Sequence, residues 1–160
     1  MTEMMSAAPH TAPSWRRLYV SARALLERVP FSVIQLAMRF AIGFVFFNAG
    51  LLKARSFEFA VKLFAQEYRL PILPPELAAQ LAMAVELSMP VLLFLGLATR
   101  FAVLPLLGMT LIIVTLVYPA SWVESLLWGS VLVTLLTRGA GVISLDHLIE
   151  RMLVKRKAAM

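Results

Sequence analysis

Four long apolar stretches constrain the fold more than any other feature of this sequence. They cover residues 33–52, 77–97, 101–118 and 123–137, and polar or turn-forming segments separate them. A helix needs about 20 apolar residues to cross the hydrocarbon core of a bilayer. Because the backbone must satisfy its own hydrogen bonds there, helices and closed barrels are the spanning structures. The pattern predicts an all-α integral membrane four-helix bundle, with the lipid bilayer as its main partner.

The composition excludes several classes of function. The chain has no cysteine, which excludes disulfides, thiolate metal sites and cysteine-ligated iron–sulfur clusters. Its two histidines, His10 and His147, lie outside the apolar stretches, and no His, Asp or Glu cluster has metal-ligand spacing. We therefore expect no metal site. The net charge of +6 comes from basic residues beside the apolar stretches rather than from a nucleic-acid surface, so no nucleic-acid partner is expected.

Amphipathic segments flank the predicted bundle. A basic stretch over residues 15–29 and a second one over residues 55–69 have apolar residues at helical spacing, which is typical of interfacial helices. Ser144 suits the N-cap of a last amphipathic helix. The predicted organisation is a disordered tail (1–14), a basic amphipathic segment (15–29), a four-span membrane domain (30–143) and a cytoplasmic C-terminal helix (144–160).

The distribution of Lys and Arg predicts the orientation. With four spans, both termini and the turn between the second and third spans share one side, which carries ten of these residues against four on the other. Basic residues are enriched in cytoplasmic loops. Both termini are therefore predicted to be cytoplasmic.

A polar stripe runs along the first span. Its members are spaced by four, three, four and three residues, so they share one helix face. They are Arg39, Gly43, Phe46, Gly50 and Lys53. The two glycines let another helix approach closely. Asn48 lies off this stripe but could still face a neighbouring helix.

Arg39 and Glu86 are opposite charges in two different spans. A charged side chain at the centre of a span costs roughly 2.5–3.5 kcal/mol on insertion scales unless it finds a partner. We therefore predict an Arg39–Glu86 ion pair, with Lys53 as a competitor. Pro90, four residues after Glu86, leaves the Glu86 carbonyl without its helical donor. Two interpretations remain open: the pair only fixes the helix packing, or it forms a site for a quinone, an anion or protons.

Other polar and turn residues are expected at the cytoplasmic end. Arg100 and Asp146 could form a contact there, which we interpret as a solvated surface pair rather than a functional one. Glycines at the span ends are expected to serve turns and helix caps. They are Gly96, Gly139 and Gly141.

Several separated motifs resemble the DoxX family of small four-span bacterial membrane proteins. They are RFAIGFVFFNAGLLK (39–53), Leu70-Pro71, Glu86, GLATR (96–100) and GAGVISLD (139–146). The resemblance covers about residues 35–151. Ala140 stands where the family often has proline between the two glycines, which should loosen the turn. The family often has a histidine near the fourth span, and this chain has none there, which weakens any role for a titrating imidazole.

The resemblance implies a membrane subunit or accessory of a redox system, either quinone-linked or related to thiol and oxidative stress. The chain would then be no enzyme on its own but a subunit of a quinone-linked oxidoreductase, with quinone as its candidate cofactor. It implies the bacterial inner membrane and either a protein partner or a homo-oligomer. Two alternatives stay open: a small transporter or permeability factor for an anion or metal-related solute, and a structural scaffold.

Overall fold

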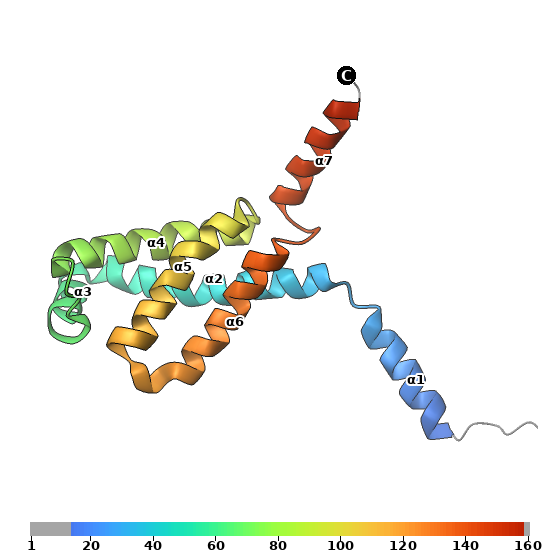
Figure 1. The fold of residues 1–160 in the computed structure, drawn as a ribbon, viewed down its shortest axis with the longest axis horizontal. Coiled ribbons are helices and arrows are strands. Elements are labelled where there is room, and N and C mark those ends of the chain that lie inside the picture. The colour runs from blue at the N-terminus through green and yellow to red at the C-terminus, as the bar shows by residue number, and fades with distance from the viewer. Residues whose placement is uncertain (1–13, 159–160) are drawn as a thin grey trace, which may run out of the picture. The chain divides into compact units, whose positions relative to one another are not determined.

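The computed structural model describes residues 14–158, and every regular element among them is helical (Figure 1). The predicted all-α class is confirmed for this part of the chain. The elements are α1 (Ser14–Glu27), α2 (Phe31–Arg55), α3 (Phe57–Leu63), the π-helical turn η1 (Phe64–Tyr68), α4 (Pro75–Leu95), α5 (Thr99–Ile112), the π-helical turn η2 (Ile113–Val117), the 3₁₀ turn η3 (Pro119–Ser121), α6 (Trp122–Arg138) and α7 (Leu145–Ala158).

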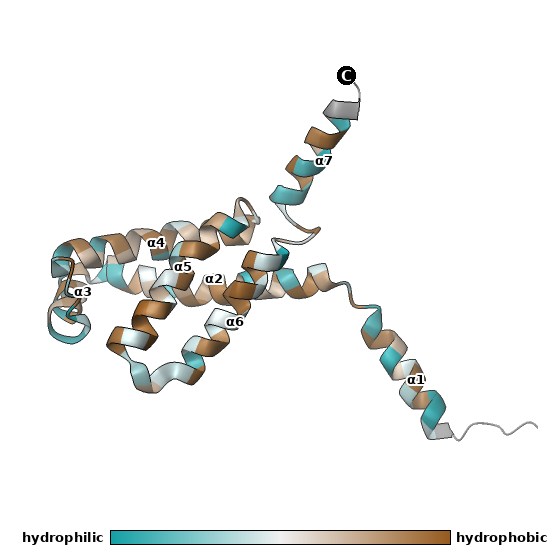
Figure 2. Ribbon diagram, in the orientation of Figure 1, coloured by the Kyte–Doolittle hydropathy of each residue, from teal (hydrophilic) through white to brown (hydrophobic). Residues whose placement is uncertain are grey.

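Four segments are long and apolar enough to cross a membrane, and they coincide with the four predicted spans. They are α2, α4, α5 with η2, and η3 with α6. Figure 2 shows mainly apolar ribbon along these segments, whereas α7 alternates polar and apolar residues. Large side chains on their outer faces, such as Phe44 and Leu126, are more than half exposed, as expected for a surface in contact with lipid.

Helix α1 belongs to a separate unit that ends at Pro30, and it is described by itself. It confirms the helix predicted from residue 15, and Arg23 and Glu27 form an exposed ion pair of 2.7 Å along it. Its placement on a membrane surface remains a prediction. The tail predicted to be disordered lies outside the described residues, apart from Ser14.

The contact between α2 and α4 determines which residues of the two helices lie opposite one another. These helices are antiparallel neighbours, and α5 packs on α4 and α6. A methyl group built on Gly43 would lie 2.5 Å from the Phe94 ring, and one on Gly50 would lie 2.9 Å from Glu86 Cβ. Gly43 therefore lies opposite Phe94 and Gly50 opposite Glu86, at distances that only a residue without a side chain permits.

Two apolar clusters fill the interior. The first lies between α2, α4, α5 and α6, and it contains Ile42, Phe46, Leu93, Ala102, Val103, Leu106, Leu132 and Leu135. The second joins α3, η1 and the first turns of α4. The cluster contains the apolar residues predicted to share one face of the segment 55–69. This segment is not one regular helix, because α3 continues as the π-helical turn η1 and Arg69 ends it with a left-handed φ of 41°.

Replacing Gly50 by valine should destabilise the bundle, because the new side chain would meet Glu86 and Leu87 within about 3 Å. Overpacking of this kind costs about 1–3 kcal/mol. Gly108 is the matched control, because a methyl group there would meet nothing within 4 Å. Thermal unfolding in detergent should show a lowered midpoint for Gly50→Val and little change for Gly108→Val. Equal effects of the two substitutions would contradict the close helix contact.

Candidate functional site

Lys53 and Glu86 form a buried ion pair between α2 and α4. The ammonium Nζ donates to both carboxylate oxygens, at 2.8 Å and 2.7 Å. Only 12% of the Lys53 side chain and 5% of the Glu86 side chain are exposed. Pro90 lies inside α4 and has no N–H for the Glu86 carbonyl. The Glu86 carbonyl is thus left without its helical donor, in the same residue whose carboxylate accepts from Lys53.

The predicted Arg39–Glu86 ion pair is wrong, because Lys53, the expected competitor, pairs with the Glu86 carboxylate instead. The helix register explains the difference. Gly50 lies opposite Glu86, and Lys53 follows Gly50 by one turn on the same face. Arg39 lies eleven residues before Gly50, which is about 16 Å along a helix and beyond the reach of its side chain.

Two cavities share part of their lining at the ion pair. We call the shared residues Lys53, Glu86 and Tyr68 the ion-pair site. The first, of about 240 Å³, lies between η1, α4 and α5, and apolar side chains such as Phe64, Leu81 and Met109 form most of its wall. The second, of about 360 Å³, lies beside α2 and α6, and its lining includes more polar groups. They are Tyr118, Ser121, Glu124 and Ser125. Lys53, Tyr68 and Glu86 border both cavities.

Aromatic side chains cover the ion-pair site at the ends of two spans. Tyr68 stacks on Phe64 at 4.5 Å between ring centres and meets the edge of Tyr118 at 6.1 Å. Burial and the nearby carboxylates of Glu86 and Glu67 raise the pKa of Tyr68, so its phenol stays a hydrogen-bond donor. Tyr68 therefore supplies a neutral donor beside the charged pair.

Arg39 donates hydrogen bonds to backbone carbonyls far from the ion-pair site. Its guanidinium is 1% exposed and donates to the carbonyls of Leu93 and Ile143. It thereby ties the end of α4 to the loop before α7. Gly96, with a φ of 64°, lies against it: a methyl group there would lie 1.9 Å from the guanidinium. The charge acts here as a multiple backbone donor.

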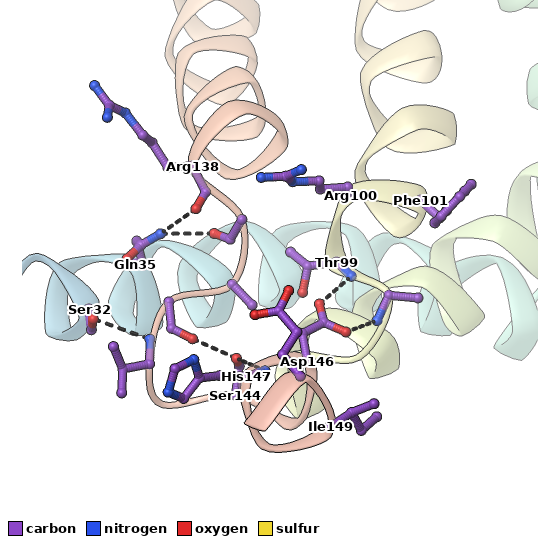
Figure 3. A pocket seen from close by; sticks show the side chains of 16 residues that line it. Ser32, Gln35, Thr99, Arg100, Phe101, Arg138, Ser144, Asp146, His147 and Ile149 are labelled. Carbon is purple, nitrogen blue, oxygen red and sulfur yellow. Dashed lines mark hydrogen bonds between the residues drawn. The ribbon is translucent and has the colours of Figure 1, made fainter. Parts of the chain in front are cut away.

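A third cavity, of about 550 Å³, lies beside this loop, and we call it the loop cavity (Figure 3). It lies between the start of α2, the turn before α5 and the segment from Arg138 to Glu150. The predicted Arg100–Asp146 contact is wrong. Asp146 instead accepts hydrogen bonds from the amides of Ala98 at 2.7 Å and Thr99 at 3.1 Å, so it caps the first turn of α5.

Of the remaining candidate residues, Gly139, Gly141 and Ser144 lie in the loop between α6 and α7, and Asn48 lies on α2. Gly139 and Gly141 line the loop cavity and adopt positive φ angles. Ser144 accepts from the His147 amide, which confirms its predicted role as the N-cap of α7. Asn48 is exposed on α2 and borders none of these three cavities, so the structure does not bring it to either site.

Sequence reasoning missed several site residues. Gln35 is 4% exposed and donates to the carbonyls of Arg138 and Gly139. Extending the α2 stripe by one turn before Arg39 would have found it. Tyr68 belongs to the apolar residues of the segment 55–69, whose spacing does not place it beside the ion pair. The partner of Tyr118, Glu67, is 51 residues away, so local spacing carries no signal for that contact.

Tyr118 should titrate at unusually high pH. Its phenol donates to the Glu67 carboxylate at 2.5 Å, which raises the pKa of Tyr118 to about 12, against about 10 for a free tyrosine. The stability linked to this proton is fully present below about pH 10 and lost as pH rises toward 12. Ultraviolet titration of phenolate should show late ionisation from both Tyr68 and Tyr118, of which Tyr118→Phe removes one tyrosine and Glu67→Gln shifts that same one downward. Tyr19→Phe is the control, and a late component lost in that variant instead would contradict the assignment.

Replacing Arg39 by methionine should loosen α7. The carbonyls of Leu93 and Ile143 would lose a buried donor, and each unsatisfied group costs about 1–3 kcal/mol. Limited trypsin digestion should then cleave faster at Arg151, and the melting temperature should fall. Arg55→Met, which removes an exposed charge, should change neither result. Unchanged cleavage in Arg39→Met would show that Arg39 does not hold the loop.

One family model matches the chain, and its description is DoxX. The match covers residues 34–119, from the first turn of α2 to the start of η3. It includes the ion-pair site and Arg39, whereas the GAGVISLD segment lies beyond it. No curated protein and no solved structure matches the chain.

Proposed function

The chain belongs to the DoxX family and is a multi-pass membrane protein, and from this premise we propose that it is a membrane subunit or accessory of a quinone-linked redox system. In this proposal the ion-pair site holds a quinone head group. The observation that carries the proposal is a buried cation–carboxylate pair at the wall of an apolar cavity between spans.

The chemistry of the residues fits such a head group. A quinone has a planar apolar ring with a carbonyl oxygen at each of two edges. Lys53 could donate to one oxygen, and Tyr68 could donate to it or to the other. Phe64, Leu81 and Met109 would surround the ring. A small number of polar groups in an apolar cavity is the common pattern of ligand sites.

Glu86 provides a group that could exchange a proton with the ligand. It borders both cavities, and the second cavity includes Ser121 and Glu124 at the polar end of α6. Reduction of a quinone takes up protons, so Glu86 could pass to the ligand in the apolar cavity a proton that arrives through the more polar one. When bound, the quinone supplies the electron-accepting chemistry.

A partner protein would supply the electrons. The chain has no cysteine to ligate an iron–sulfur cluster, and among residues 14–158 no three His, Asp or Glu side chains gather to hold a metal. The proposal is therefore a quinone-binding subunit rather than a complete oxidoreductase.

The interior supports a binding site better than a conduction path. The first apolar cluster lies between the level of Arg39 and the level of Lys53 on α2, with Ile42 and Phe46 facing Leu93 and Leu106. An ion on its way across would have to pass these side chains without a polar partner. This arrangement favours the quinone proposal over the transporter alternative.

The proposed location is the bacterial inner membrane with both termini cytoplasmic. The excess of Lys and Arg on the side of the termini supports this orientation. The ion-pair site would then lie toward the periplasmic side of the bilayer.

Titration of the purified protein with a short-chain quinone tests the proposal. Ligand at 100 times its dissociation constant should stabilise the folded state by about 2.7 kcal/mol, which raises the melting temperature. Lys53→Met with Glu86→Gln should weaken binding by at least about tenfold, because bonds to charged groups contribute about 1.5–3 kcal/mol. The double change avoids leaving one buried charge alone.

Lys62→Met with Glu58→Gln is the matched control, since it removes the same charges from exposed positions of α3. This control should bind quinone as the wild type does. An unchanged melting temperature of the wild type at saturating quinone would refute the proposed function.

A further inference from the structure

We propose that the loop cavity binds the phosphate group of a membrane phospholipid. This site is separate from the ion-pair site and does not depend on the proposed quinone function. The inference rests on two arginines of the lining that form no ion pair among the described residues, on one buried hydroxyl without a partner, and on the position of the cavity at the ends of three spans.

Two arginines of the lining are available to an anion. Arg100 lies in the first turn of α5 and Arg138 ends α6. In Figure 3 the Arg100 side chain reaches toward the loop that links α6 to α7, and the Arg138 side chain extends away from the start of that loop. Both are exposed, and among the described residues neither has a carboxylate within 4 Å. A guanidinium binds a phosphate through two parallel hydrogen bonds, which makes arginine the preferred phosphate ligand.

Asp146 forms no ion pair with either arginine. Its two oxygens are held by the amides of Ala98 and Thr99, as Figure 3 shows. The other carboxylate of the lining, Glu150, is exposed on α7. It could accept from a hydroxyl or ammonium group attached to the phosphate, which fits the polar ends of common phospholipids.

Thr99 provides the independent sign of a ligand. Thr99 lines the loop cavity and is 0% exposed. Among the described residues, its hydroxyl has no hydrogen-bond partner. A buried hydroxyl without a partner costs about 1–3 kcal/mol. A phosphate oxygen in the cavity would accept from this hydroxyl and remove that cost.

The position of the cavity favours a lipid over a free phosphate. It lies where α2 and α5 begin and α6 ends, so in a bilayer its level is that of the phospholipid head groups. Apolar side chains also line it and reach its outside: Phe101 is 76% exposed, Val142 60% and Ile149 44%. Two cations beside exposed apolar side chains match an amphiphile whose chains enter the membrane.

Lipid titration of the full-length protein in a nonionic detergent tests the proposal. The probes are a short-chain phosphatidylglycerol, the corresponding phosphatidylethanolamine and inorganic phosphate, and the measurement is the rise in melting temperature. We expect saturable stabilisation by at least one of the lipids and none by inorganic phosphate at the same concentration. Arg100→Gln with Arg138→Gln should lower the lipid affinity by about ten- to hundredfold, the loss expected for bonds to charged groups.

Two further variants separate a site from a general charge effect. Arg55→Gln with Lys62→Gln removes two exposed cations near the opposite ends of the spans and should leave the lipid affinity unchanged. Thr99→Val replaces the unpartnered hydroxyl by a methyl group of similar size. It should keep or raise the stability without lipid, yet weaken lipid binding about tenfold.

Three results would overturn the proposal. The first is no stabilisation of the wild type by either lipid, and the second is an equal loss of affinity in the Arg55/Lys62 control. The third is stabilisation by inorganic phosphate equal to that by lipid, which would assign the cavity to a soluble anion. Circular dichroism of each variant establishes that a lost rise in melting temperature reflects lost lipid binding and not lost folding. Unchanged lipid affinity of Thr99→Val would contradict a contact between the Thr99 hydroxyl and the lipid phosphate.

Discussion

The close contact of α2 with α4 is the interaction on which the other features of the bundle depend. Gly43 and Gly50 bring the two helix backbones together, and their contacts with Phe94 and Glu86 fix one register. That register gives each cation of α2 its own partner. Lys53 meets the Glu86 carboxylate, and Arg39 meets carbonyl groups at the other end of α4. A shift by one turn would separate both sets of bonds, so packing and charge select the same arrangement.

The two cations of α2 illustrate two ways of stabilising charge between membrane helices. Lys53 is neutralised by a carboxylate, whereas Arg39 spreads its charge over backbone carbonyls and lies beside the turn at Gly96. Lysine is a compact charge and arginine a planar set of donors. The first arrangement leaves a charged pair beside two cavities, while the second holds the loop before Asp146 and α7.

Much of the fold could be predicted because the apolar stretches are long and admit one solution. The register could not be predicted, because it depends on side-chain contacts between helices and not on the length of either helix. Arg39 and Glu86 were paired from their estimated depths, but the contact at Gly50 places Glu86 about 16 Å from the level of Arg39 along the helix. Asp146 was paired with Arg100 by charge, although two amides at the start of α5 bind it instead. The contact of Tyr118 with Glu67 joins residues far apart in sequence, so no local pattern marks it.

The first apolar cluster keeps the hydrogen bonds at the two ends of the bundle apart. The side chains of Ile42, Phe46 and Leu93 carry no polar atom that could pass a proton between Glu86 and Arg39. Substitutions at the two ends share no partner, and such effects on stability add. The DoxX bundle can thus acquire a new ligand at one end while keeping the architecture of the other, which makes each end an independent unit for evolution and for engineering.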